Sequence, residues 1–423
     1  MWSVKRLAWL SDGRQKTMVR PTPNKYNKNM HLRGILLSGG LLAAAAVLFS
    51  AADNQQLPAP HATPGVRNSP TVIPKPEGAT LSVPKGFHAE VWAEGFVTPR
   101  YMTLGPGNEI LLADSGRGGP DGTIYVFGAN KERKKLIEGL RHPYGMAFLQ
   151  DYLYVGEVDS VKRYKYDAKA MAAGPGEEVV SLKGLTADHW TRMLLFDRAG
   201  GKLYVGVGSG SNSSPGGDPR RAAIDRYNPD GSGHELFATG TRNPTTLRWY
   251  PGTDTLWASV QERDMLGDDL VPDYFTHIQQ GGFYGWPYAY IGPHEDPDVK
   301  PQDHPELIAK TLVPDVLLGA HVAVLDFIFY TGKQFPAEYR GGAFLAFHGS
   351  WNRSKRVGQS IGFIPFKNGK PSGELREVMK GWMLSPDQRE VWGRPVGLLQ
   401  LPDGSLLISE DGNKKIWRLS YQN

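Results

Sequence analysis

The sequence predicts an all-β protein, a six-bladed β-propeller whose ring is closed by N- and C-terminal strands in one blade. Two observations lead to this fold. A hairpin of two short strands recurs about six times at intervals of about 40 to 80 residues, and a polar residue stands before the first strand of each copy. Repeats of this length built from short strands favour a propeller over a solenoid of helices.

The clearest copy of the hairpin spans residues 188–209, DHWTRMLLFDRAGGKLYVGVGS. Its first predicted strand is Arg192–Phe196, a turn containing glycine follows, and the second predicted strand is Lys202–Val207. Val, Tyr and Leu alternate with small residues in the second strand, which suits a sheet covered on both faces.

The polar residues that precede the first strands are expected to meet at one place. The first strand of each propeller blade lines the central channel, so residues just before it gather at one mouth. We therefore expect a single polar, largely cationic site, although each residue taken alone could be an ordinary residue of a loop between blades. These residues are Arg100, His142, His189, Arg242, His321 and Arg394.

Neither end of the predicted propeller forms a complete blade by itself. Residues 86–96 form a lone strand before the first full repeat, and the last repeat has only three clear strands, ending at residues 414–421. We expect the N-terminal strand to complete the last blade, because closure of the ring removes exposed sheet edges.

Composition excludes several classes of protein. The chain of 423 residues has no Cys, which excludes disulfides, thiolate metal sites, haem attached through CxxCH and a lipobox anchor. Residues 1–34 hold eight Lys and Arg and one acid, a net charge of +7, so subtraction from the total of +5 leaves −2 for the rest. The basic charge belongs to the N-terminus and gives no reason to expect nucleic-acid binding.

The chain divides into three predicted parts. Residues 1–52 form a basic leader with an uncharged stretch at 34–52, which is read either as a cleaved signal peptide or as an uncleaved membrane anchor. Met30 is an alternative start. Residues 53–80 form a Pro-rich linker, and residues 81–423 form the propeller. Either reading of the leader predicts an exported protein, periplasmic or secreted, with the inner membrane reached only through the N-terminal segment.

The fourth repeat contains a long insertion, QERDMLGDDLVPDYFTHIQQGGFYGWPYAYIGPHEDPD. Long irregular insertions in compact folds usually carry function. Its carboxylates are the hard oxygen ligands that Ca²⁺ takes, but the spacing of an EF-hand is absent. A solvated acidic loop is the alternative.

Several motifs, each in its own repeat, resemble the glucose/sorbosone dehydrogenase family. They are HWTR within DHWTRMLLFDRAGGKLYVGVGS, RNP within GTRNPTTLRW, GGFYGWP, FHGSWNRS and GRPVGLLQLPDGSLLISEDG. The similarity is greatest to the sorbosone-dehydrogenase-like branch and covers about residues 80–423. The family consists of six-bladed propellers that use pyrroloquinoline quinone (PQQ) and Ca²⁺ to oxidise sugars. The resemblance therefore implies a PQQ-dependent oxidation of an aldose or a sugar-derived aldehyde.

The resemblance also implies catalytic residues. His189 matches the family's general base, which takes a proton from the sugar hydroxyl while hydride moves to the quinone. Asp188 would orient or polarise it. Arg242 and Asn243 match the pair that contacts the quinone, and a guanidinium also suits the charge that grows on the reduced cofactor.

Further residues are implied as cofactor contacts. Arg394 matches a cationic contact. His142 and His321 fall where the family has polar contacts, though the residue types differ. Arg353 is the candidate for the remaining cation, with Lys355 as its alternative.

For the metal, the resemblance implies that backbone carbonyls of Glu262 and Arg263 bind Ca²⁺. These two residues stand where glucose dehydrogenases have Gly-Pro, a change that carbonyl ligands tolerate.

Two other classes of function stay open. Six-bladed propellers also serve as Ca²⁺-dependent lactonases, and others are binding modules without activity. The arginines and histidines expected at the channel would be a poor cage for Ca²⁺ and a good one for a tricarboxylate. With no haem motif present, the expected partners are a small sugar or aldehyde and a separate electron acceptor, a cytochrome or a quinone.

Overall fold

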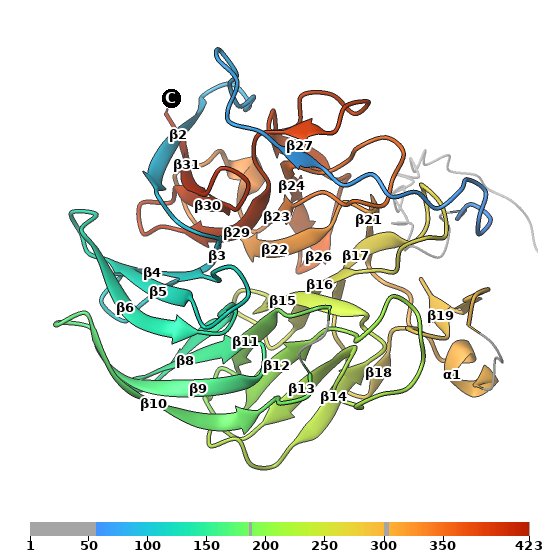
Figure 1. Ribbon diagram of the computed structural model, residues 1–423, viewed down its shortest axis with the longest axis horizontal. Helices are drawn as coiled ribbons and strands as arrows, with labels where there is room; N and C mark the ends of the chain where they lie inside the picture. Colours follow the sequence, from blue (N-terminus) through green and yellow to red (C-terminus); the bar gives the residue numbers. More distant parts are fainter. Residues whose placement is uncertain (1–55, 186–187, 300–303, 423) are drawn as a thin grey trace, which may run out of the picture. The chain divides into compact units, whose positions relative to one another are not determined.

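The computed structural model describes residues 56–185, 188–299 and 304–422. Within these residues, six sheets of four or five strands are arranged around a common centre (Figure 1). This confirms the predicted β-propeller. The predicted leader, residues 1–52, lies outside the described residues.

The first three blades follow one another along the chain, each running from its inner to its outer strand. Blade 1 contains β3 (Pro99–Leu104), β4 (Ile110–Asp114), β5 (Gly122–Phe127) and β6 (Arg133–Leu140). Blade 2 contains β7 (Met146–Leu149), β8 (Tyr152–Glu157), β9 (Ser160–Asp167) and β10 (Ala172–Ser181). Blade 3 contains β11 (Arg192–Phe196), β12 (Leu203–Val207), β13 (Ala223–Tyr227), β14 (Glu235–Thr239) and the short parallel β18 (Gly282–Phe283).

The remaining blades complete the ring. Blade 4 contains β15 (Asn243–Trp249), β16 (Leu256–Gln261), β17 (Pro272–His277) and β21 (Val316–Ala320). Blade 5 contains β22 (Val324–Phe329), β23 (Ala343–Phe347), β24 (Ser360–Ile364) and β27 (Arg376–Met379). Blade 6 contains β29 (Pro395–Gln400), β30 (Leu406–Glu410), β31 (Lys415–Tyr421) and β2 (Phe87–Glu94).

Short elements fill the connections between these strands. They are β1 (Thr71–Val72), β19 (Ala289–Tyr290), β20 (His294–Glu295), α1 (Pro305–Ala309), η2 (Ala337–Tyr339), β25 (Phe366–Lys367), β26 (Lys370–Pro371) and β28 (Glu390–Val391). Among the described residues, no helix has the length and apolar character needed to cross a membrane.

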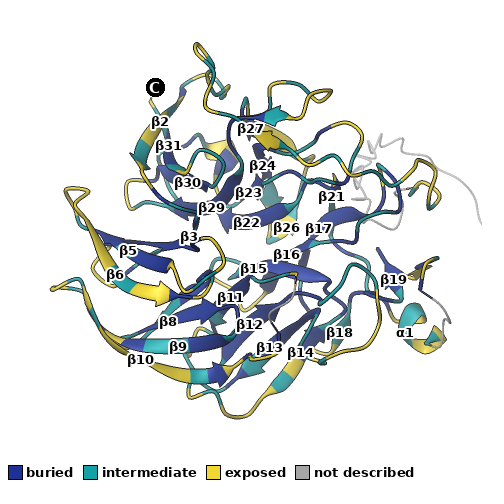
Figure 2. Ribbon diagram, viewed as in Figure 1, coloured by how far each residue is buried: buried dark blue, intermediate teal, exposed yellow. Residues whose placement is uncertain are grey.

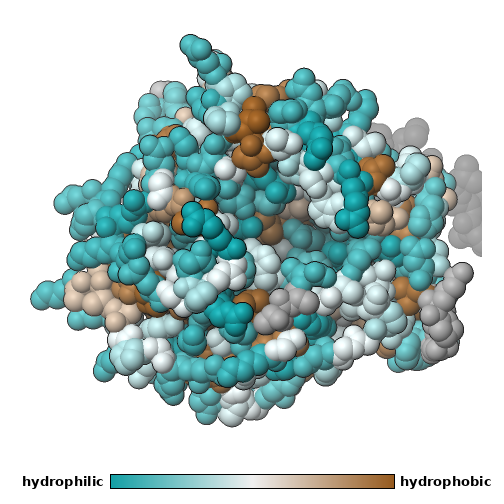
Figure 3. All heavy atoms as spheres, viewed as in Figure 1, coloured by the Kyte–Doolittle hydropathy of each residue, from teal (hydrophilic) through white to brown (hydrophobic). Residues whose placement is uncertain are grey.

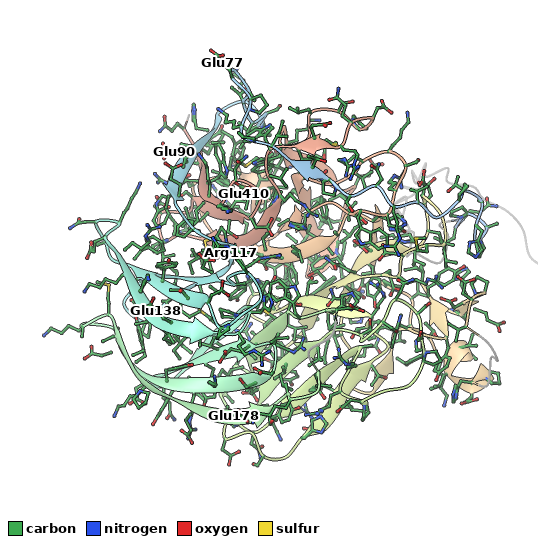
Figure 4. The ribbon with its side chains drawn as sticks, viewed as in Figure 1. Glu77, Glu90, Arg117, Glu138, Glu178 and Glu410 are labelled. Carbon is green, nitrogen blue, oxygen red and sulfur yellow. The ribbon has the colours of Figure 1, made fainter. Side chains whose placement is uncertain are left out.

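Burial follows position in the blade. The second strand of blade 3, LYVGV, is buried at every residue because neighbouring blades cover both of its faces. The outer strands β6 and β10 are largely exposed (Figure 2). Figure 4 shows the same arrangement for the labelled acids: Glu90, Glu138 and Glu178 lie on outer strands, and Glu410 lies closer to the centre.

The ring closes as the sequence predicts. β2 pairs antiparallel with β31, in a register that runs from Phe87 opposite Tyr421 to Glu94 opposite Lys415. The N-terminal strand is therefore the outer strand of the blade formed by the C-terminus, and this pairing joins the two ends of the propeller.

The segment predicted as a linker is extended, and it is also bonded to the propeller. β1 pairs in parallel with β28, and the amide of Asn68 donates to the carbonyl of Trp351 at 2.6 Å. Further along, the amide of His61 donates to the carbonyl of Leu266 at 2.8 Å. Residues 61–73 therefore lie on the loops of the fourth, fifth and sixth blades.

Candidate functional site

A cavity of about 670 Å³ opens where the inner strands begin. Residues just before or at the start of five inner strands line it together, although they are far apart in the sequence. Figure 3 shows a hollow with mainly hydrophilic walls near the middle of the face in view. The predicted residues that line the cavity are Arg100, Asp188, His189, Arg242, Asn243, Glu262, His321 and Arg394.

A repeated contact between a backbone N–H and a carboxylate fixes the chain where it enters the first strand of three blades. A carboxylate at the end of the second strand accepts a hydrogen bond from a backbone N–H just before or at the start of the first strand of the same blade. Because the two strands pair, this contact fixes the chain where it enters the channel. The contacts are Thr98 N to Asp114 at 2.6 Å, Arg141 N to Glu157 at 2.7 Å and Arg394 N to Glu410 at 3.3 Å.

His189 is held in place by the strand that follows it. Arg192, the first residue of β11, is fully buried. Its Nη1 donates to the carbonyls of His189 and Thr191, both at 2.8 Å, and its Nη2 donates to the carbonyl of Leu185. Gly208 lets His189 lie close to β12, because a Cβ there would be only 2.4 Å from the Cβ of His189.

The hydrogen bonds of His189 fix its tautomer. Its Nδ1 lies 2.9 Å from the carbonyl oxygen of Ser209, which can only accept. The hydroxyl of Ser209 is 3.0 Å from the same nitrogen and donates to the carbonyl of Ser211 at 2.6 Å. The proton therefore sits on Nδ1, and Nε2 keeps a free lone pair. Ser209, and not Asp188, makes the hydrogen bonds that orient this imidazole.

The surroundings of His189 keep it neutral. Burial, followed by the positive charge of Arg242, lowers its pKa from the ordinary value of 6.5 to about 3. A neutral imidazole with a free Nε2 is suited to accept a proton at neutral pH.

Arg242 lies buried beside His189. Its Nη1 donates to the carbonyl of Glu262 at 2.7 Å, and its Nε donates to the carbonyl of Asn212 at 3.0 Å. Asp264 lies 3.5 Å away as an ionic partner. The neighbouring Asn243 donates to the side chain of Gln261 at 2.9 Å, while its buried Oδ1 has no partner among the described residues.

His321 differs from His189 in its protonation. Its Nε2 lies 2.8 Å from the carbonyl of Gly267, and its Nδ1 lies 3.4 Å from a carboxylate oxygen of Asp264. Burial opposes the charged form, but these contacts and the charge of Asp273 outweigh it and raise the pKa of His321. Both ring nitrogens of His321 therefore face acceptors, which favours its charged form and makes it a poorer general base than His189.

The opposite wall is also cationic. The guanidinium of Arg394 donates to the carbonyls of His348 and Gly349. Arg100 pairs with Asp411 at 3.0 Å and lies over the ring of Trp190 at 5.0 Å. His348 lies 2.9 Å from the same Asp411, and burial together with Arg394 lowers the pKa of His348 to about 4.

Three of the predicted residues are not among those that line the cavity. His142 stacks on Trp190 with ring centroids 4.6 Å apart, so it supports the wall from behind. Arg353 pairs with Asp269 at 2.7 Å, and its alternative Lys355 lies 3.4 Å from Asp387.

The third is Arg263, whose guanidinium is buried against Asp296 at 2.8 Å and Asp298 at 3.0 Å. The predicted carbonyl ligand at Glu262 faces Arg242, and a carbonyl has a second lone pair that a metal ion could share. Among the described residues, no group of three or more acidic, His or Cys side chains is placed to hold a metal ion.

Sequence reasoning missed several residues of this site. Ser209 acts through its backbone carbonyl, which every residue type has, so the sequence does not mark it. Arg192 does have one: a charged residue at the start of an otherwise apolar strand, within the HWTR motif. His348, Asp411 and Arg67 come from loops with no periodic pattern.

Comparison with known proteins agrees with this fold. A protein of Borreliella burgdorferi, described only as uncharacterized, is 27% identical over 380 residues, which cover 84% of this chain and 94% of that protein. The calcium structure of a Trichoderma reesei enzyme of carbohydrate-active family AA12 has a TM-score of 0.68 at 20% identity, covering 84% of this chain and 99% of that one. The holo form of the PQQ domain of pyranose dehydrogenase from Coprinopsis cinerea has a TM-score of 0.68 at 20% identity, covering 82% and 98%.

At these identities the solved structures establish the shared fold. The family follows from the sequence match, because the model of the TrAA12-like family matches residues 81–272 and 302–422. The resemblance to glucose/sorbosone dehydrogenases inferred from the motifs is thereby confirmed, and the chain belongs to the TrAA12-like family.

Proposed function

We propose that this protein is a PQQ-dependent dehydrogenase that oxidises an aldose or a sugar-derived aldehyde, with His189 as general base. One observation carries the proposal: a neutral imidazole lies beside Arg242 in a cavity that Arg100 and Arg394 also line. Membership of the TrAA12-like family supports oxidoreductase chemistry on sugars, and one protein of similar fold is the holo form of a PQQ domain.

The side chains of the cavity fit PQQ, which carries carboxylates and a quinone. Guanidinium groups bind carboxylates through charge-assisted hydrogen bonds, and three of them line this cavity from separate blades. The buried Nε of Arg100 has no hydrogen-bond partner among the described residues, so it is a donor that a bound carboxylate would satisfy. The contacts of His321 raise its pKa and so favour a further positive charge in the cavity wall.

When bound, PQQ supplies the electron sink that takes up hydride from the substrate carbon. His189 accepts the proton of the substrate hydroxyl at Nε2, while the Ser209 carbonyl stabilises the imidazolium that forms. Arg242 lies next to the imidazole, where its charge offsets negative charge that develops during the reaction. We also propose that Ca²⁺ binds the carbonyl oxygens of Glu262 and Arg263, where it would reduce the negative charge of the cofactor.

The decisive experiment is reconstitution. The apo-protein is incubated with PQQ, with and without Ca²⁺, and screened against aldoses, sugar acids and aldehydes with an artificial electron acceptor. We expect acceptor reduction that depends on PQQ and on one group of sugars. A protein that shows no such activity with any of these substrates, but hydrolyses lactones with Ca²⁺ alone, would instead be a propeller hydrolase.

The expected location and partner are also part of the proposal. Residues 34–52 support export to the periplasm or beyond, with or without retention at the inner membrane. Electrons would then leave to a separate acceptor, a cytochrome or a quinone. Fractionation of cells that express the full chain checks the location.

A further inference from the structure

The N-terminal strap, residues 61–73, forms part of the cavity mouth. It precedes the part of the chain that matches the family, which begins at residue 81. In Figure 1 this segment, in blue, crosses the face of the molecule on the side of β17, β21 and β27. Both ends of the strap are bonded to the propeller, at His61 to the Leu266 carbonyl and at β1 to β28.

The middle of the strap is held firmly. The side chain of Asn68 donates to the carbonyls of Arg353 and Ser354, both at 3.0 Å, and Asn352 donates to the carbonyl of Val66 at 2.6 Å. Arg356 donates to the side-chain oxygen of Asn68 at 3.0 Å. The residue between Val66 and Asn68 is therefore fixed in position by its neighbours.

That residue, Arg67, is one of the residues that line the cavity. Its guanidinium carbon lies 5.2 Å from the centre of the Trp351 ring, and Trp351 lines the cavity too. Among the described residues, no ion pair joins Arg67 to a carboxylate, and its side chain is exposed. The strap thus brings a cation without an acidic partner to the cavity mouth.

The stacking on Trp351 prepares this cation for a particular ligand. A guanidinium that lies on an aromatic ring uses its face for that contact, and its edge still presents N–H donors. The edge of a guanidinium matches a carboxylate through two parallel hydrogen bonds. Trp351 restricts the side chain beforehand, so less conformational entropy is lost when the ligand binds.

We propose that Arg67 is a carboxylate-binding residue of the cavity mouth. Two ligands have this chemistry: PQQ itself, through a carboxylate that reaches the mouth, and a substrate that is a sugar acid. The proposal rests on the proposed function where it concerns turnover. Binding of a carboxylate at Arg67 does not require turnover.

The experiment uses the full-length protein with Arg67→Gln, Arg67→Lys and the control Lys75→Gln. Lys75 is a matched control because it is exposed on the same N-terminal segment and stacks on an indole, that of Trp392 at 5.9 Å, but does not line the cavity. Calorimetry measures the binding of PQQ and of D-glucuronate to the apo-protein. Kinetics of the reconstituted enzyme compare KM for D-glucuronate and for D-glucose.

We expect Arg67→Gln to weaken the binding of one of the two carboxylate ligands by about ten- to a hundredfold, the usual effect of losing a charge-assisted hydrogen bond. Arg67→Lys should lose part of this affinity, because it keeps the charge without the paired donors. Weaker PQQ binding with unchanged KM values assigns the carboxylate to the cofactor. A raised KM for D-glucuronate with unchanged KM for D-glucose assigns it to the substrate.

Other outcomes separate this inference from the proposed function. If the wild type oxidises no sugar, but Arg67→Gln still binds PQQ or D-glucuronate more weakly than Lys75→Gln does, the proposed function is wrong and the inference is upheld. If the wild type and both Gln variants bind the two carboxylates with equal affinity, and thermal unfolding shows that the variants are folded, Arg67 only fastens the strap and the inference is overturned.

Discussion

Two histidines in the same cavity have pKa values shifted in opposite directions, and their partners explain the difference. Burial disfavours the charged form of both His189 and His321. His189 has acceptors at Nδ1 only, both from Ser209, and a cationic neighbour in Arg242. His321 has acceptors at both nitrogens and acidic neighbours. Residue type alone would make either a candidate base, and only the contacts distinguish them.

Replacement of the proposed base tests its role in catalysis. With His189→Ala we expect kcat of the PQQ-loaded enzyme to fall by roughly 10²- to 10⁴-fold, the usual contribution of a general base. PQQ affinity should change little, because the arginines provide most of the charge. Steady-state kinetics at saturating PQQ provide the measurement. A near-normal kcat would mean that another residue is the base. His348 would be the next candidate in the cavity, because its pKa is also lowered.

Replacement of Arg242 should have a different signature. Arg242→Gln removes a buried charge that faces the cavity, so PQQ binding should weaken by about ten- to a hundredfold together with turnover. Calorimetric titration of the apo-protein with PQQ gives the affinity, and circular dichroism establishes that the variant is folded. Unchanged PQQ affinity would show that the cofactor does not contact this guanidinium.

The lowered pKa of His189 also predicts how stability depends on pH. In the folded apo-protein its pKa is about 3, whereas in the unfolded chain it is near 6.5. Between these values the unfolded chain binds a proton that the folded protein does not, so stability is lost as pH falls from about 6.5 towards 3. Urea unfolding at several pH values should show that the wild type loses more stability than His189→Gln on acidification. If the free energy of unfolding depends on pH in the same way in both proteins, the pKa of His189 is not lowered in the folded protein.

At the scale of elements, the hairpin β11–β12 places the base through backbone contacts. Arg192 fixes the loop before β11, and β12 ends next to Gly208 and Ser209, which touch His189 from the other side. The position of His189 therefore depends on the register of this hairpin, in which Arg192 lies opposite Val207.

Gly208→Ala tests this packing. Its Cβ would lie 2.4 Å from the Cβ of His189 and 2.5 Å from Oδ1 of Asn243, so both residues would have to move. We expect kcat to fall by at least about tenfold, since small displacements of a catalytic group are costly. Gly201→Ala is the control, because it is exposed in the turn of the same hairpin and its nearest contact would be an ordinary 3.7 Å. Equal kcat for both variants would show that the close approach of Gly208 has no role.

The sequence predicted where the cavity wall lies better than it predicted the side-chain contacts there. The polar residue before each first strand indicates the cavity wall, since strand periodicity and propeller geometry together fix where that position lies. Three predicted residues, His142, Arg263 and Arg353, do not line the cavity, because side chains on irregular loops turn towards local partners such as Trp190, Asp296 and Asp269. Periodicity carries no information about such contacts.

At the scale of the whole molecule, ring closure was predictable and the strap was not. An orphan strand at one end and an incomplete repeat at the other define a pairing that only closure satisfies, and β2 does pair with β31. The predicted linker that contains the strap has six prolines, between positions 58 and 76, and no apolar run. Its attachment depends on single contacts such as those of Asn68, which composition cannot reveal.

Closure itself can be tested at Phe87, the first residue of β2. Its ring is buried and contacts Phe335 with centroids 4.8 Å apart and Tyr339 at 5.2 Å, both in blade 5, and Tyr421 of β31 at 5.1 Å. Phe87 therefore holds β2 against its own blade and against the neighbouring one. Phe87→Ala removes these contacts and leaves a cavity, which should lower the free energy of unfolding by about 3 to 5 kcal/mol.

The matched control is Val91→Ala in the same strand, where the side chain is 42% exposed and the expected change is within about 0.5 kcal/mol. Denaturant unfolding measures both variants. Because β2 is the outer strand of the blade that joins the two ends of the chain, its release would expose the edge of β31, and hydrogen exchange of β31 should rise in Phe87→Ala. If the two variants are equally stable and β31 stays protected, the ring is held closed by the backbone pairing of β2 and β31 alone.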